Sequence, residues 1–193
     1  ASPVMTSLSH RASALFDALE QRFDAGNAAT ADLHRCLRLV LVDTMAVAVA
    51  GLGQPALQAL QEQQQRLAPG SVALPGMGVS LSAAAAAQVL AAAACWDELV
   101  EGYAPAHGRP ALHVVPVCMA LGQALQRPLG SVLMALLQGY ELGARFGEAY
   151  QVPAGEHVDG TWGTVAATVA ASVLLQLPAP QRAGALTAAR TQK

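Results

Sequence analysis

Apolar residues recur every three or four positions along most of this chain, which is the spacing of helices that bury one face. The stretch 33–50 shows the pattern clearly. Its apolar stripe consists of Leu37, Val40, Leu41, Thr44, Met45 and Ala48. The same analysis predicts about eight helices, at residues 7–23, 33–50, 55–67, 83–95, 114–125, 131–150, 160–177 and 181–189.

Serine and proline mark where several of these helices begin. Ser80 or Ser82 is expected to cap the alanine-rich helix, and Pro116 is expected in the first turn of its helix, where no N–H is needed. Residues 71–74 form either a short extended piece or a loop. No strand alternation and no repeat of about 20–50 residues stands out. We therefore expect one all-α domain over residues 1–193, with 83–95 and 164–175 as central helices.

The composition excludes several classes of protein. Hydrophobic residues make up 53% of the chain and the net charge is −2, so the basic stripe of a nucleic-acid-binding protein is missing. The longest apolar runs are shorter than the roughly 20 residues that span a membrane, which favours buried helices. No secretory signal is visible, and we expect a cytoplasmic protein with reduced, buried thiols at Cys36, Cys95 and Cys118.

Polar residues are concentrated in two stretches, and the first joins two predicted helices. It contains Asp97, Glu98, Glu101, His107 and Arg109. Asp97 and Glu101 are four residues apart, so on a helix they would share one face and could orient a histidine or hold a substrate hydroxyl. The alternative is a solvated helix end followed by a structural turn, in which Arg109 pairs with Glu101 or Asp97.

The second polar stretch precedes an apolar helix and contains His157, Gly160 and Thr161. Glycines at a helix start leave N–H groups open to an anion such as a carboxylate, although a helix cap with close packing explains them equally well. Two loops that each bring a histidine with acidic neighbours are the minimal set for two-sided acid–base catalysis. His107 and His157 lack a third ligand at matching spacing, so no metal site is expected.

The remaining histidines and one buried-helix aspartate are expected to be structural. His10 and His34 lie on amphipathic helices, and His113 lies where a helix begins. Asp43 interrupts an apolar helix, where a capping or buried hydrogen-bonding role is more common than catalysis.

Several segments resemble, in order, motifs of the MmgE/PrpD family, which contains 2-methylcitrate dehydratases and cis-aconitate decarboxylases. Residues 39–51 look like its LLDTLGVALAG opening, and residues 84–96 look like its alanine helix before an acidic motif. Residues 107–116 are similar to HPS…VLPA, and residues 139–145 are similar to GYEVAAR. Residues 157–164 resemble HPTGTLGT, which is the most specific of these matches.

The resemblance implies both a fold and an activity. Members have a large helical domain and a smaller α+β lid, usually form homodimers, and dehydrate, decarboxylate or epimerise small polycarboxylates without a metal or an organic cofactor. It implies that His107 and His157 occupy the two active-site histidine positions, and that Asp97 stands for the first aspartate of a DFDDT motif. The residues expected to bind the carboxylate substrate are Arg109, Glu101, Gly160 and Thr161.

Two departures from the family pattern lead to two hypotheses. The acidic motif reads DELVEG, so the second aspartate and the threonine of the family motif have no match. The sequence also ends before the family's TKPLHAG segment with its active-site lysine, for which Lys193 falls too early. The first hypothesis is one part of an enzyme, to which a second subunit contributes the lid and the lysine. A homo-oligomer is expected in addition to that subunit or in place of it. The second is a non-catalytic helical partner that keeps the fold for assembly.

Overall fold

The computed structural model describes residues 14, 18, 21, 31–149, 152, 155 and 161–191. Within them the chain is all-α apart from one small hairpin, as the sequence predicts. The helices are α2 (Ala31–Leu52), α3 (Pro55–Leu67), α4 (Ala83–Cys95), α5 (Pro110–Ala124), α6 (Leu129–Ala149), α7 (Trp162–Leu174) and α8 (Ala179–Thr191), with a 3-10 turn, η1, at Ala104–Ala106. The helix predicted at 7–23 lies outside the described residues, except for Ala14, Ala18 and Gln21, which are helical and exposed.

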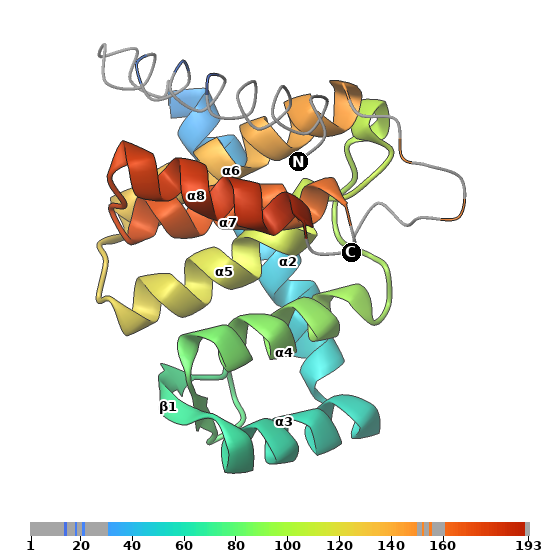
Figure 1. Ribbon diagram of the computed structural model, residues 1–193. Coiled ribbons are helices and arrows are strands. Elements are labelled where there is room, and N and C mark those ends of the chain that lie inside the picture. The colour runs from blue at the N-terminus through green and yellow to red at the C-terminus, as the bar shows by residue number, and fades with distance from the viewer. Residues whose placement is uncertain are drawn as a thin grey trace.

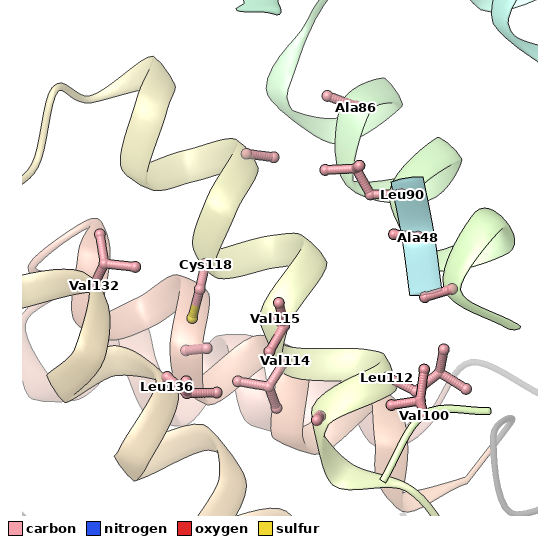
Figure 2. Packing of buried hydrophobic residues seen from close by; sticks show 14 of the residues in the cluster. Ala48, Ala86, Leu90, Val100, Leu112, Val114, Val115, Cys118, Val132 and Leu136 are labelled. Atoms are coloured by element: carbon pink, nitrogen blue, oxygen red, sulfur yellow. The ribbon is translucent and has the colours of Figure 1, made fainter. Parts of the chain in front are cut away.

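Helix α5 lies at the centre of the bundle. It contacts α4 on one side and both α6 and α7 on the other, while the long helix α2 crosses behind α4 and α5 (Figure 1). Val115 and Cys118 of α5 are fully buried, as is Leu136 of α6, and these side chains belong to one continuous core (Figure 2). Helix α8 covers α7, and α3 lies beside α4 at the end of the molecule.

Small residues allow α6 and α7 to pack closely. Gly139, Gly143 and Gly147 follow one another at four-residue spacing on α6, so they lie on one face of that helix. A Cβ at Gly143 would stand 2.6 Å from the Cβ of Ala166 in α7. The glycines of the GYELGARFG segment therefore form a row against which α7 rests.

Helix α5 begins four residues earlier than the sequence predicts. Pro110 is its first residue, and Pro116, expected in the first turn, lies inside the helix. An interior proline removes one helical hydrogen bond and typically destabilises a helix by about 3 kcal/mol. Most residues of α5, Pro116 included, are buried, so packing against the neighbouring helices offsets this loss.

The same helix-ending turn occurs twice, 50 residues apart. Gln126, after α5, has φ +51°, and Gln176, after α7, has φ +53°. Each turn contains the long hydrogen bond of a Schellman motif, 2.8 Å in the first and 3.0 Å in the second. Pro128 and Pro178 follow, so α7 ends at Leu174 and not at 177 as predicted. The two copies share only the short pattern Leu-Gln-x-Pro, too little to reveal a period in the sequence.

The stretch that the sequence leaves open between loop and strand is part of a hairpin. Strands β1 (Pro69–Ala73) and β2 (Ser80–Leu81) pair antiparallel, and β1 contacts α4 and α5. Ser82 then caps α4 as expected, because its hydroxyl accepts a hydrogen bond from Ala85 N at 3.3 Å.

Candidate functional site

The loop 96–109 leads from α4 to α5 and carries most of the candidate residues. Glu98 has φ +53°, a left-handed conformation that ends the helical path. Asp97 and Glu101 therefore do not share a helix face, and that prediction is wrong. The left-handed turn sends Val100 into the core while Asp97 and Glu98 stay exposed, so burial of one apolar side chain outweighs continuation of the helix.

Glu101 holds this loop in place. One of its carboxylate oxygens accepts a hydrogen bond from Ala111 N at 2.8 Å, and the other accepts one from the Tyr140 hydroxyl at 2.9 Å. The Glu101 N–H donates to the Asp43 carboxylate at 3.1 Å. Glu101 therefore ties the loop to α2, to the first turn of α5 and to α6. Asp43 forms a hydrogen bond, as the sequence predicts, but its side chain is exposed and not buried.

Burial raises the pKa of the Glu101 carboxyl, although the hydrogen bonds from Ala111 N and Tyr140 act in the opposite direction because they favour the charged form. Burial also raises the pKa of Tyr140, and the Glu101 carboxylate beside it adds to that shift. Tyr140 therefore stays protonated and remains a hydrogen-bond donor. Because both Glu101 oxygens already accept a bond from the protein, only their second lone pairs are open to a substrate hydroxyl.

His107 lies in a turn that a backbone hydrogen bond closes. Tyr103 N donates to Gly108 O at 2.8 Å, which closes the loop around η1. Ala106, inside the turn, is buried against α6, where a Cβ at Gly147 would stand 2.6 Å from the Ala106 Cβ. His107 follows with φ +51° and an exposed side chain. Contacts within the loop and with α6 thus fix the backbone from which the imidazole projects.

The side chain of Arg109 is held less tightly than that of Glu101. Its guanidinium lies 3.5 Å from the Glu98 carboxylate, and the Glu98 side chain is 70% exposed. The expected alternative, a pair with Glu101 or Asp97, is not what forms. Exposed ion pairs of this kind contribute little to stability, so a substrate carboxylate can replace Glu98 at Arg109 at low cost.

Asp97 is flanked by exposed apolar side chains. Trp96 is 47% exposed and Leu99 is 71% exposed. Among the described residues the Asp97 carboxylate makes no hydrogen bond or ion pair, and none joins it to His107. An unpaired carboxylate beside exposed apolar surface is open to a substrate or to another polypeptide.

The start of α7 forms the second described part of the site. Thr161 precedes the first helical residue, and its carbonyl accepts a hydrogen bond from the Thr164 hydroxyl at 2.7 Å. The His113 ring meets the Trp162 ring edge-on, with 5.7 Å between their centroids. A Cβ at Gly163 would lie 2.5–2.6 Å from three atoms of the His113 ring. Gly163 therefore lets an imidazole from α5 rest directly on the backbone of α7.

Two of the predicted site residues, His157 and Gly160, lie outside the described residues. The loop 96–109 contains Asp97, Glu101, His107 and Arg109, and Thr161 lies at the start of a neighbouring helix, α7.

The sequence did not predict that Tyr140 is the partner of Glu101, nor which residue His113 contacts. The signal for Tyr140 was present, since it is one of only three tyrosines and lies within the GYE segment. Nothing in the sequence near His113 points to Gly163, because the contact joins residues 50 positions apart.

The fold and this site define a class of protein, an all-α domain in which the polar loop 96–109 leads into the buried helix α5 and Thr161 lies at the start of the neighbouring helix α7. The family model described as the MmgE/PrpD N-terminal domain matches residues 24–193. The chain therefore belongs to the MmgE/PrpD family, and the matched portion is the N-terminal one that the motifs indicated. A search of curated proteins finds no match.

In the described part of the chain, no three histidine, cysteine, aspartate or glutamate side chains gather in an arrangement that could hold a metal ion. No single helix in that part is long and apolar enough to cross a membrane, and only α2 and α3 together, bent by 91° at their break, reach the required length and composition.

Proposed function

We propose that this domain forms one side of the active site of a cofactor-independent lyase or isomerase that acts on a small polycarboxylate. Membership of the MmgE/PrpD family is the observation that carries the proposal. His107 and His157 act as acid and base, and Asp97 fixes a histidine tautomer or holds the substrate hydroxyl. Arg109 and the start of α7 at Thr161 receive carboxylates, and Glu101 and Gly160 complete the set of substrate-binding candidates.

The proposed chemistry needs a base and an acid around one carbon–carbon bond. In dehydration, one histidine removes a proton from the carbon next to a carboxylate, and the other protonates the hydroxyl leaving the adjacent carbon, so that a double bond and water form. In decarboxylation the acid protonates the carbanion left by carbon dioxide, and in epimerisation the proton returns to the opposite face. Imidazole suits both roles because its ordinary pKa is about 6.5, and each transfer contributes on the order of 10²–10⁴-fold.

Three features of the loop 96–109 support this role. His107 is exposed, and its backbone is fixed by contacts within the loop and with α6. Arg109 loses only a long, exposed ion pair with Glu98 when it binds another anion. Trp96 and Leu99 leave apolar surface around Asp97. We propose that a second subunit, which brings the family's lid and active-site lysine, covers this surface.

A non-catalytic partner subunit is the second candidate function. Glu101 favours it, because this residue lies in the acidic motif and uses both carboxylate oxygens to hold Ala111 and Tyr140. In that case the loop keeps its shape to support assembly, and turnover by the complex does not depend on His107.

The variant His107→Asn distinguishes the two candidates. Asparagine tolerates the left-handed backbone at this position and removes the imidazole. In the complex with its partner, turnover of 2-methylcitrate or cis-aconitate, followed by the ultraviolet absorbance of the carbon–carbon double bond, should fall at least about 100-fold, while the thermal midpoint stays unchanged. His34→Asn, at an exposed position on α2, is the matched control. Full turnover by His107→Asn would exclude His107 as acid or base and support the non-catalytic role.

A further inference from the structure

The GYELGAR segment of α6 has no part in the proposed chemistry, yet α6 holds the loop 96–109 through polar side chains. Tyr140 donates a hydrogen bond to Glu101 of the loop at 2.9 Å. About two turns further along α6, Glu148 accepts a hydrogen bond from the hydroxyl of Tyr103, which also belongs to the loop. The loop is therefore fixed to α6 at two points, by side-chain hydrogen bonds that run in opposite directions.

The Glu148 carboxylate is itself held in place on the helix. The Arg145 guanidinium lies 3.1 Å from the same Glu148 oxygen that accepts the Tyr103 hydroxyl, and its other nitrogen lies 3.3 Å from Glu141. Only 33% of the Glu148 side chain is exposed. A charged acceptor that is paired and largely covered keeps its direction, so it can orient the hydroxyl that it binds.

Tyr103 is the first residue of the turn 103–108, which carries His107. Its backbone N–H donates to Gly108 O at 2.8 Å, and its carbonyl accepts a hydrogen bond from Ala106 N at 3.1 Å. Both backbone groups of Tyr103 therefore take part in closing the turn. A constraint on the Tyr103 side chain is a constraint on the whole turn.

The end of α6 holds this turn at two places, and η1 lies against it (Figure 1). Glu148 binds the Tyr103 hydroxyl, and a Cβ at Gly147 would stand 2.6 Å from the Ala106 Cβ, so Ala106 packs on the helix backbone. His107 follows with a left-handed φ of +51°. Few residues other than glycine adopt this conformation, and it persists where the surroundings hold it.

We infer that Tyr103 and Glu148 are positioning residues for His107. Their hydrogen bond fixes the first residue of the turn and so keeps the backbone of His107 in one place. Proton transfer depends steeply on the position of the acid or base, and a displacement of about 1 Å can lower a rate about 100-fold. The inference rests on the proposed role of His107 as acid or base. Because Tyr103 is only half-buried, the bond should limit local opening of the turn more than it adds to global stability.

Two readouts test the inference: hydrogen exchange of the full chain, and turnover by its complex with the partner. In Tyr103→Phe and in Glu148→Ala, the amides of Tyr103 or its replacement and of His107 should exchange about 10-fold faster, while the buried amides of α5 keep their rates. With 2-methylcitrate or cis-aconitate as the probe, kcat should fall about 10- to 100-fold. KM should stay near the wild-type value, because Arg109 and the start of α7 are untouched.

Three further variants separate a positioning role from a general structural one. Glu148→Gln keeps an acceptor oxygen for Tyr103 and should leave both readouts near the wild-type values. The double variant Tyr103→Phe/Glu148→Ala should lower kcat no further than either single change, because both changes remove the same bond. Glu141→Ala is the matched control, since it removes the other ion pair of Arg145 on the same helix and should change neither readout.

Unchanged exchange of the turn amides in Tyr103→Phe overturns the inference, whether or not the complex is active. Faster exchange with an unchanged kcat also overturns it, because the position of His107 then does not limit the reaction. Additive losses in the double variant count against it as well. Full turnover by His107→Asn is a different result: it excludes the proposed function, and the exchange rates still decide whether Tyr103 and Glu148 hold the turn.

Discussion

Glu101 has a partly buried carboxyl that accepts hydrogen bonds from two helices, α5 and α6, while its backbone N–H donates to Asp43 of a third, α2. Desolvation disfavours its charge more than Ala111 N and the Tyr140 hydroxyl stabilise it, so its pKa is raised in the folded protein above the ordinary value of 4.5. The folded protein therefore holds this proton more tightly than the unfolded chain does. The stability that results is fully present below the ordinary pKa and is lost as pH rises through the raised one.

The variant Glu101→Gln should lose this pH dependence. In the wild type, the free energy of unfolding should contain a component that falls as pH rises above 4.5, and glutamine has no proton to release. Urea denaturation at a series of pH values between about 4 and 7 measures it. Glu62→Gln, at an exposed position on α3, should keep the wild-type profile. Parallel profiles for the wild type and Glu101→Gln would contradict the assignment.

Tyr140→Phe should destabilise the protein by about 1–2 kcal/mol at neutral pH, because it removes a donor to a charged, partly buried carboxylate. It should also raise the pKa of Glu101 further. Chemical denaturation gives the first quantity, and its pH dependence gives the second. Tyr103→Phe is the control: its hydroxyl bonds to Glu148 at the surface, so the change in stability should be smaller. Equal losses of stability in the two variants would mean that the Tyr140–Glu101 hydrogen bond contributes no more than a hydrogen bond at the surface.

At the scale of helices, glycine decides how closely α7 can approach its neighbours. Because Gly143 of α6 has no side chain, Ala166 of α7 can approach its backbone closely. In the same way, Gly163 of α7 leaves room for the His113 ring of α5. These two contacts join three of the most buried helices. The glycines of the family-like motifs therefore have a packing role, whatever ligand the start of α7 binds.

Gly163→Ala should destabilise the protein by about 1–3 kcal/mol, because the new methyl group would overlap the His113 ring. Thermal or urea unfolding measures the loss. Gly130→Ala is a close control, since Gly130 is also the second residue of its helix but has no atom within 4 Å of the added Cβ. It should be neutral or stabilising by up to about 1 kcal/mol. His113→Ala in the same chain should partly restore Gly163→Ala, and failure to do so would exclude the His113 clash as the cause.

At the scale of the whole molecule, α2 leaves an apolar stripe uncovered. Leu39 is 58% exposed, Val42 is 65% exposed and Val49 is 46% exposed, and the exposed Ala46 lies between them. Residues 39, 42, 46 and 49 follow the alternating three- and four-residue spacing by which two helices pack along a seam. We propose that another subunit covers this stripe.

Val42→Glu should therefore disrupt the assembly. Sedimentation at micromolar concentration should show the wild type as a species larger than one chain, and the variant should shift toward the monomer because a carboxylate would be buried in the seam. Leu67→Glu is the control, since Leu67 is 70% exposed but lies at the end of α3, away from the stripe. A monomeric wild type without a co-purifying partner would refute the proposed contact.

Several features follow from the sequence alone because their signals are local. Pro55 starts α3 and Ser82 caps α4, since a proline ring and a capping hydroxyl act on backbone groups within one helical turn. The order of the apolar and glycine-containing motifs also indicates the MmgE/PrpD family. Helix existence, the all-α class and the family are therefore readable from residue types and their spacing.

Other features depend on which segments pack together, and only the tertiary structure decides them. Pro116 lies inside α5 because the helix is buried from its first turn, and Glu98 ends the preceding helical path so that Val100 can enter the core. The partner of Glu101 is Tyr140, 39 positions away, and His113 rests on Gly163, 50 positions away. Local signals extend over a few residues, whereas burial and hydrogen-bond partners over these separations are set by the packing of whole helices.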